Sequence, residues 1–125
     1  MLHCFNIGHT DVSLDIHFEL NGKTLTNNSA VDLNDIGEGE GALLCKTNHP
    51  NCCGTPPNRF GNFFYPNGRQ IPIRSRNAGF YRNRGEQMIR LNRIEGVTSP
   101  TGKFRCEIPD ANGVMKSIYI TINNN

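Results

Sequence analysis

Two cysteines, each set in a short apolar stretch, limit the fold of this chain more than any other feature. Cys45 follows two leucines, and Cys106 lies in the alternating run 104–108. The second cysteine follows the first by 61 positions. In a β-sandwich of seven strands, the second and sixth strands face each other across the core, roughly 60–70 residues apart. The spacing therefore predicts a disulfide between Cys45 and Cys106 that joins two sheets, which in turn favours an oxidising, extracellular compartment.

Apolar and polar side chains alternate in several short segments of the chain. In residues 12–20 an aliphatic or aromatic side chain occupies every second position up to the turn 21–22, and residues 118–122 repeat the pattern. A period of two is typical of strands with one buried face, and no long helical period is present. Strands are predicted at residues 12–20, 29–36, 42–47, 62–65, 69–73, 80–81, 88–91, 103–108 and 114–122, and Pro72 limits the fifth of them to a sheet edge.

These segments predict an all-β fold, a sandwich of two antiparallel sheets with about seven to nine strands. We expect one domain over residues 12–122, preceded by a leader at 1–11 and followed by a tail at 123–125. No apolar stretch has the length of a membrane span. The first six residues lack the basic and apolar parts of a secretory signal, so an extracellular chain of this kind would be a mature segment or a domain of a longer protein.

Several stretches of the sequence resemble strands of immunoglobulin-like domains. They lie at residues 43–45, 63–68 and 100–106. The stretches 81–85, 89–93 and 99–110 are similar to a subset of these domains in large receptor-like proteins of early-branching animals. The resemblance covers about residues 12–122. It implies an immunoglobulin-like sandwich of the cell surface, and it implies no particular ligand, because the family is defined by its fold.

Two positions depart from the pattern of that family. The chain has no tryptophan, and Phe63 stands where the family has the tryptophan that packs on the disulfide. Phe104 stands two residues before the second cysteine, where the family has a tyrosine whose hydroxyl bonds to the backbone. Both phenylalanines keep the apolar bulk, so we expect the sandwich core to form without that tyrosine's hydrogen bond.

Three further cysteines leave several pairings open. Cys4 could pair with Cys52 or Cys53. Alternatively, the adjacent Cys52 and Cys53 could form a disulfide with each other. Because the chain has five cysteines, at least one thiol stays free or pairs between chains. A zinc site is the alternative, since Cys45, His49, Cys52 and Cys53 place four soft ligands within nine residues. The disulfide is favoured because Cys45 lies inside a predicted strand and has a cysteine partner, and no metal is expected.

Charge is distributed unevenly along the chain. The first 56 residues contain two basic and seven acidic side chains, whereas residues 57–106 contain ten basic and two acidic ones. Guanidinium groups on one edge would suit the carboxylates of an acidic protein or the sulfates of an anionic glycan. The plainer interpretation is a solvated face with internal ion pairs, and a homophilic contact between the acidic and basic parts is a third. The candidate binding residues are Arg74, Arg76, Arg82, Arg84, Arg90 and Arg93.

The remaining motifs favour binding over catalysis. Apart from His49 in the zinc alternative, the histidines have no partner at the spacing of a metal site or a catalytic base. His17 lies on the polar face of its predicted strand, where we expect it to be exposed. The glycines of 37–41 are followed by no helix that would make a phosphate loop. The sequence Asn27-Asn28-Ser29 makes Asn27 a glycosylation candidate.

The sequence as a whole predicts a recognition or adhesion module outside the cell, without catalysis and without a cofactor. Its expected partner is a protein or an anionic glycan at the cell surface, and the oxidising compartment argues against nucleic acid. The alternative is a spacer domain that binds no ligand and positions other domains of a larger receptor-like protein.

Overall fold

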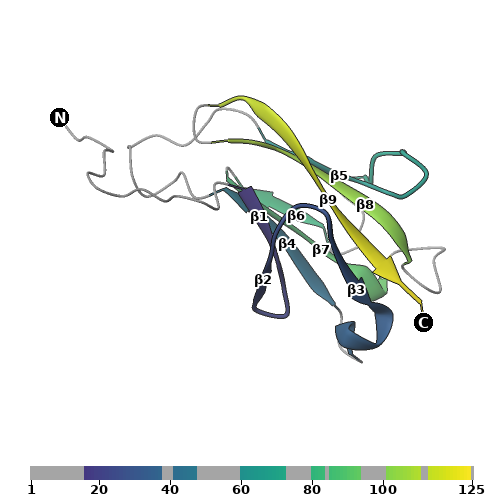
Figure 1. The fold of residues 1–125 in the computed structure, drawn as a ribbon. Coiled ribbons are helices and arrows are strands. Elements are labelled where there is room, and N and C mark those ends of the chain that lie inside the picture. The colour runs from purple at the N-terminus through teal and green to yellow at the C-terminus, as the bar shows by residue number, and fades with distance from the viewer. Residues whose placement is uncertain are drawn as a thin grey trace, which may run out of the picture.

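The chain folds into two facing β-sheets, the two layers of a β-sandwich (Figure 1). One sheet has five strands in the order β2-β1-β4-β7-β6, and the other has four in the order β3-β9-β8-β5. The predicted all-β sandwich is confirmed. The computed structural model describes residues 16–37, 41–47, 60–72, 80–83, 85–93, 101–110 and 113–124.

Nine strands and two short 3-10 helices make up this part of the chain. Neither of these helices is long and apolar enough to cross a membrane. The strands are β1 (Ile16–Leu20), β2 (Lys23–Leu25), β3 (Ser29–Asp32), β4 (Ala42–Thr47), β5 (Asn62–Phe64), β6 (Tyr81–Asn83), β7 (Glu86–Arg90), β8 (Gly102–Pro109) and β9 (Met115–Asn123), and the helices are η1 (Leu33–Ile36) and η3 (Leu91–Arg93).

A disulfide joins the two layers at the centre of the core. Cys45 lies on β4 in the five-stranded sheet and Cys106 on β8 in the four-stranded sheet, with their Cα atoms 6.6 Å apart. Both side chains are fully buried. The predicted bridge between the sheets is confirmed. Its neighbours on the inner faces follow the predicted alternation and include Phe18, Leu43, Phe104, Ile108, Ile118, Ile120 and Ile122.

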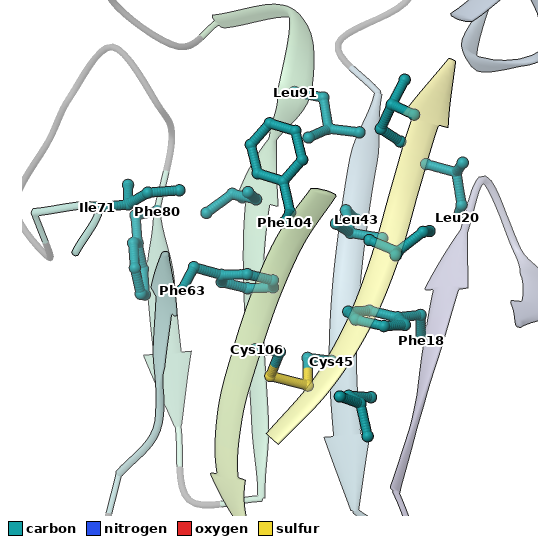
Figure 2. Close-up of a cluster of buried hydrophobic side chains, with 14 of the residues drawn as sticks. Phe18, Leu20, Leu43, Cys45, Phe63, Ile71, Phe80, Leu91, Phe104 and Cys106 are labelled. Atoms are coloured by element: carbon teal, nitrogen blue, oxygen red, sulfur yellow. A yellow bond between two sulfur atoms is a disulfide. The ribbon is translucent and has the colours of Figure 1, made fainter. Parts of the chain in front are cut away.

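Phe63 packs beside this disulfide (Figure 2). It is fully buried and pairs in register with Cys106 on the neighbouring strand. Its ring meets the ring of Phe80 edge to face, with the centroids 5.9 Å apart. This is a geometry that aromatic pairs favour. The phenylalanine that stands in place of tryptophan therefore fills a core position next to the bridge, and Phe104 is buried as well.

Asn21 and Gly22, predicted only as the end of a strand, form a two-residue hairpin turn. Both residues have positive φ, 52° and 84°, and Leu20 pairs with Lys23 across the turn. A two-residue turn with positive φ at both positions matches the twist of antiparallel strands. The hairpin therefore continues into β2, a strand that was not predicted.

The segment predicted as one strand over 29–36 is a strand only as far as Asp32, so the second half of this prediction was wrong. The 3-10 helix η1 follows, and both Leu33 and Ile36 pack against the core. Side chains three positions apart lie on one side of a 3-10 helix but on opposite faces of a strand. The helix turns both residues towards the core, with Ile36 buried and Leu33 partly buried, which a strand could not do.

Two further details of the predicted sheets were wrong. β3 pairs with β9 in parallel, because the chain changes sheets between β2 and β3 instead of reversing within one sheet. The segment predicted as an edge strand over 69–73 does pair with β5 at the sheet edge, through the backbone N–H groups of Tyr65 and Ile71. Within the described residues, however, it is shortened to one bridge between Phe64 and Gln70. Pro72 has no N–H group with which to continue that pairing.

Candidate binding surface

The outer face of the four-stranded sheet carries the residues that alternate with the core positions. Successive side chains of a strand point to opposite faces, so the neighbours of buried Phe104, Cys106 and Ile108 point outward. We call this surface the β9–β8–β5 face. It consists of Ser117, Tyr119 and Thr121 on β9, Lys103, Arg105 and Glu107 on β8, and Asn62 and Phe64 on β5.

A row of large side chains crosses the middle of this face. Tyr119 pairs in register with Arg105, and Arg105 pairs with Phe64. The guanidinium carbon of Arg105 lies 3.6 Å from the centroid of the Phe64 ring, and Lys103 Nζ lies 4.8 Å from the centroid of Tyr119. A cation over the face of an aromatic ring is attracted by the ring's negative face. Two cations are therefore held in place by two aromatic rings.

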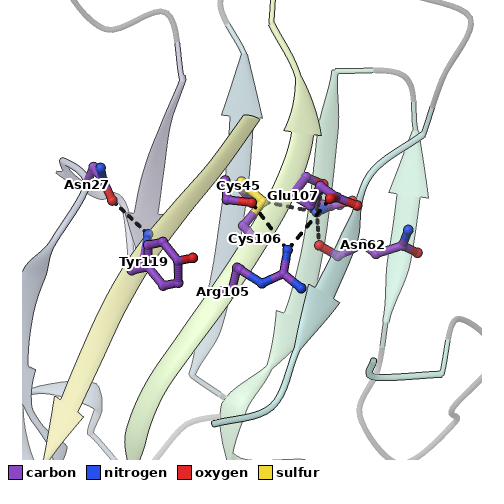
Figure 3. The surroundings of a disulfide bond; sticks show 9 residues. Asn27, Cys45, Asn62, Arg105, Cys106, Glu107 and Tyr119 are labelled. Atoms are coloured by element: carbon purple, nitrogen blue, oxygen red, sulfur yellow. Dashed lines mark hydrogen bonds and ion pairs between the residues drawn. A yellow bond between two sulfur atoms is a disulfide. The ribbon is translucent and has the colours of Figure 1, made fainter. Parts of the chain in front are cut away.

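Polar contacts fix Arg105 in this row (Figure 3). Its Nη1 donates a hydrogen bond to Ser117 Oγ at 3.2 Å and lies 3.6 Å from Glu107 Oε2. The side chains of Arg105 and Glu107 remain 28% and 34% exposed. The guanidinium group is therefore oriented by the sheet and still accessible to a partner.

The buried side-chain amide of Gln87 contacts β5 and β8 from the inner side of the sandwich. Gln87, on β7 of the opposite sheet, is 1% exposed. Its Nε2 donates to the carbonyl oxygen of Asn62 at 3.0 Å and lies 3.0 Å from Cys106 Sγ. Gln87 thus links the two layers beside the disulfide and holds β5 and β8 in position.

The arginines predicted as a binding cluster are not brought together where the structure describes them. Arg82 on β6 pairs with buried Gln87, so both belong to the inner side of their sheet, whereas Arg90 at the end of β7 belongs to the outer side. Arg82 Nη1 donates to the carbonyl oxygen of Gly61 at 3.0 Å. Its guanidinium group therefore links the two sheets at the edge of the sandwich, between β6 and the residue that precedes β5. Arg90 also has an interaction partner, and Arg93 ends η3. Arg74, Arg76 and Arg84 lie outside the described residues.

The other predicted sites fall partly outside the described residues. Cys4, His49, Cys52 and Cys53 are not described. The zinc alternative required Cys45, whose sulfur is bonded to Cys106, so that set of four ligands is excluded. Asn27 lies exposed in the turn between β2 and β3.

The outer face of the five-stranded sheet has a different character, because its charges are paired. Lys46 Nζ lies 3.4 Å from Glu19 Oε2 and 3.7 Å from Glu86 Oε1. His17 lies next to this pair, with Nε2 3.5 Å from Glu19 Oε2. The prediction that His17 is exposed was wrong, since only 7% of it is accessible. Alternation placed it on the outer face but did not show how far its neighbours cover it.

Tyr81 belongs to the same network and should titrate late. Its hydroxyl donates a hydrogen bond to Glu86 Oε2. Burial, together with that hydrogen bond and the charge of Glu86, raises the pKa of Tyr81 from 10.0 to about 12. Because the folded state holds this proton more tightly than the unfolded state, the stabilisation is complete below pH 10.0 and is lost as the pH rises through about 12. We expect an ultraviolet titration to show one tyrosine ionising near pH 12, and Glu86→Gln to lower its pKa.

The Tyr81→Phe variant provides the control for this titration. It should remove the late ionisation and leave the rest of the curve unchanged. A Tyr81→Phe curve that retains the late step would contradict the assignment.

The β9–β8–β5 face was not predicted from the sequence, although part of its signal was present. Lys103, Arg105 and Glu107 alternate with buried residues along one predicted strand, which marks them as outward-facing. Their assembly with Tyr119 and Phe64 depends on strand register, which no local pattern gives. Compared with known protein families and with curated proteins, the chain matches none.

Proposed function

We propose that this domain is an extracellular, non-catalytic recognition module of the immunoglobulin-like kind that binds an acidic protein surface through its β9–β8–β5 face. The disulfide in the core supports an oxidising compartment, because such bonds persist in secreted proteins and ectodomains. The two-sheet architecture and the core phenylalanines beside the bridge agree with the immunoglobulin-like resemblance of the sequence.

The row Tyr119–Arg105–Phe64 is the observation that carries the proposal. Tyrosine and arginine are, together with tryptophan, the residue types enriched among those that dominate binding energy at protein interfaces. Here the arginine is already stacked on Phe64 and hydrogen-bonded to Ser117. Side chains that are ordered before binding lose less conformational entropy when a partner docks. The face therefore offers a preorganised centre with cations that suit carboxylates.

A protein partner agrees with this face better than an anionic glycan does. Sulfated glycans are held mainly by clusters of cations, whereas Arg105 lies beside the carboxylate of Glu107. The centre of the face also carries Tyr119, Arg105 and Phe64, which are residue types enriched at protein interfaces. We therefore assign the acidic protein as partner and treat the glycan as an outcome of the test.

The experiment probes a multimer of the purified domain on an array of extracellular proteins that includes the domain itself, and on immobilised heparin. We expect binding to an acidic protein that falls at least about tenfold with Arg105→Glu or Tyr119→Ala, given typical hot-spot effects. Lys23→Glu, an exposed change on β2 of the other sheet, is the matched control and should leave binding unchanged.

Two results would overturn the assignment, namely an array without any bound protein and protein binding that Arg105→Glu leaves intact. If no protein binds, heparin retention that Arg105→Glu abolishes would assign the face to an anionic glycan. Absence of both protein binding and heparin retention would favour the spacer alternative. Circular dichroism of each variant confirms that the sandwich is folded.

A further inference from the structure

The turn between β2 and β3 holds the side-chain amide of Asn27 in one orientation. Asn27 Oδ1 accepts a hydrogen bond from the backbone N–H of Tyr119 at 2.8 Å (Figure 3). The N–H of Asn28 donates to the carbonyl oxygen of Tyr119, also at 2.8 Å. The turn is therefore hydrogen-bonded to β9 through both the backbone N–H and the carbonyl oxygen of Tyr119. The other half of the amide, Nδ2, has no hydrogen-bond partner among the described residues, and Asn27 is exposed.

We infer that Asn27 Nδ2 carries an N-linked glycan in the secreted protein. Asn27-Asn28-Ser29 is the only acceptor sequence of this kind in the chain. The donor would be an oligosaccharide attached to a lipid pyrophosphate. A bond forms between Nδ2 and the anomeric carbon of the sugar, the bond from that carbon to the pyrophosphate oxygen breaks, and Nδ2 loses one proton.

The folded turn accommodates this modification without losing a native contact. The glycan replaces one hydrogen of Nδ2, and the carbonyl oxygen Oδ1 still accepts the hydrogen bond from Tyr119. Ser29 Oγ donates to the carbonyl oxygen of Thr26 at 2.7 Å, which closes the turn on its other side. A glycan is bulky and hydrophilic, so it is compatible with an exposed turn of this kind.

A glycan on Asn27 would affect the edge of the four-stranded sheet but would leave most of the β9–β8–β5 face accessible. Asn27 lies where the chain enters β3, the edge strand of the four-stranded sheet, so the sugar would hinder pairing of that edge with another chain. It also lies at the β9 margin of the β9–β8–β5 face, whereas Arg105 and Phe64 lie on the next two strands. The stacked arginine would therefore remain open to a partner.

The inference rests on the extracellular location in the proposed function but not on the partner, and its test is separate. The chain is expressed in animal cells behind a cleavable secretory signal, and the secreted and retained fractions are analysed by mass spectrometry before and after peptide-N-glycosidase. We expect a glycan on Asn27 that the enzyme removes with conversion of Asn27 to aspartate. Ser29→Ala should abolish the glycan and Ser29→Thr should retain it, while both keep the asparagine that Tyr119 contacts.

Absence of the glycan from the wild-type protein in both fractions would overturn the inference, as would a glycan that persists in Ser29→Ala. The same proteins are then applied to the array of extracellular proteins. Ser29→Ala should bind within about twofold of the glycosylated protein, because the glycan, attached beside Tyr119, leaves the stacked pair Arg105 and Phe64 open. Failure of glycosylated protein to bind any partner would contradict the proposed function alone.

Discussion

Replacing both Cys45 and Cys106 by alanine is expected to lower the free energy of unfolding by roughly 4 kcal/mol, the loop-closure entropy that a crosslink across 61 residues removes from the unfolded chain. A domain of this size has a total stability of about 5–15 kcal/mol. The variant should therefore be marginal at ambient temperature. Urea unfolding followed by tyrosine fluorescence measures the loss.

A reductant provides the control for this change. Dithiothreitol should lower the unfolding midpoint of the wild-type protein towards that of the double variant, and should have little further effect on the variant. Coincident midpoints of wild type and variant without reductant would show that the bridge does not stabilise the fold.

Phe63→Ala is expected to cost about 3–5 kcal/mol, the range measured when a buried phenylalanine is truncated. The side chain is fully buried, lies opposite Cys106 in register and loses its edge-to-face contact with Phe80. The cavity would open between the two layers, where the surrounding strands are fixed by the disulfide and cannot close it. Urea unfolding again provides the measurement.

Phe60→Ala is the matched control for that prediction, because it removes the same atoms from a side chain that is 41% exposed. Phe60 contributes one cation–π contact with Arg82, so its truncation should cost only about 0.5–1 kcal/mol. Equal losses for the two variants would show that Phe63 is not part of a packed core.

The sequence predicted the core of this fold better than its edges, because core positions leave a local pattern. The alternation around Cys106 and in β9 showed which side chains face inward, and the spacing of two cysteines indicated that their strands lie in different sheets. The same alternation failed at Leu33 and Ile36, where packing both residues against the core required a change from strand to 3-10 helix. It also missed β2, since Lys23–Leu25 is too short to show a period and is explained only by the turn before it.

The candidate surface could be predicted only in part, because it depends on which residues lie opposite each other. The alternation of side chains predicts that Arg105 and Tyr119 each face outward. Their pairing, and the stacking of Arg105 on Phe64, follow from the register of three strands. Arg82 illustrates the opposite error. Its place in a basic segment suggested binding, whereas its pairing with Gln87 directs it to the sandwich edge, where a backbone carbonyl accepts its hydrogen bond.

The position of β9 has a consequence for how the domain folds during synthesis. β9 is the last strand along the chain in the described residues, yet it lies between β3 and β8 in its sheet. Its pairing with β3 joins residue 29 to residue 120, so the contact spans most of the domain. Contacts of such long range slow folding, and domains are completed as units when their last segment emerges. Until residues 115–123 have left the ribosome, β3 has no partner strand in its sheet, and the four-stranded layer cannot be completed.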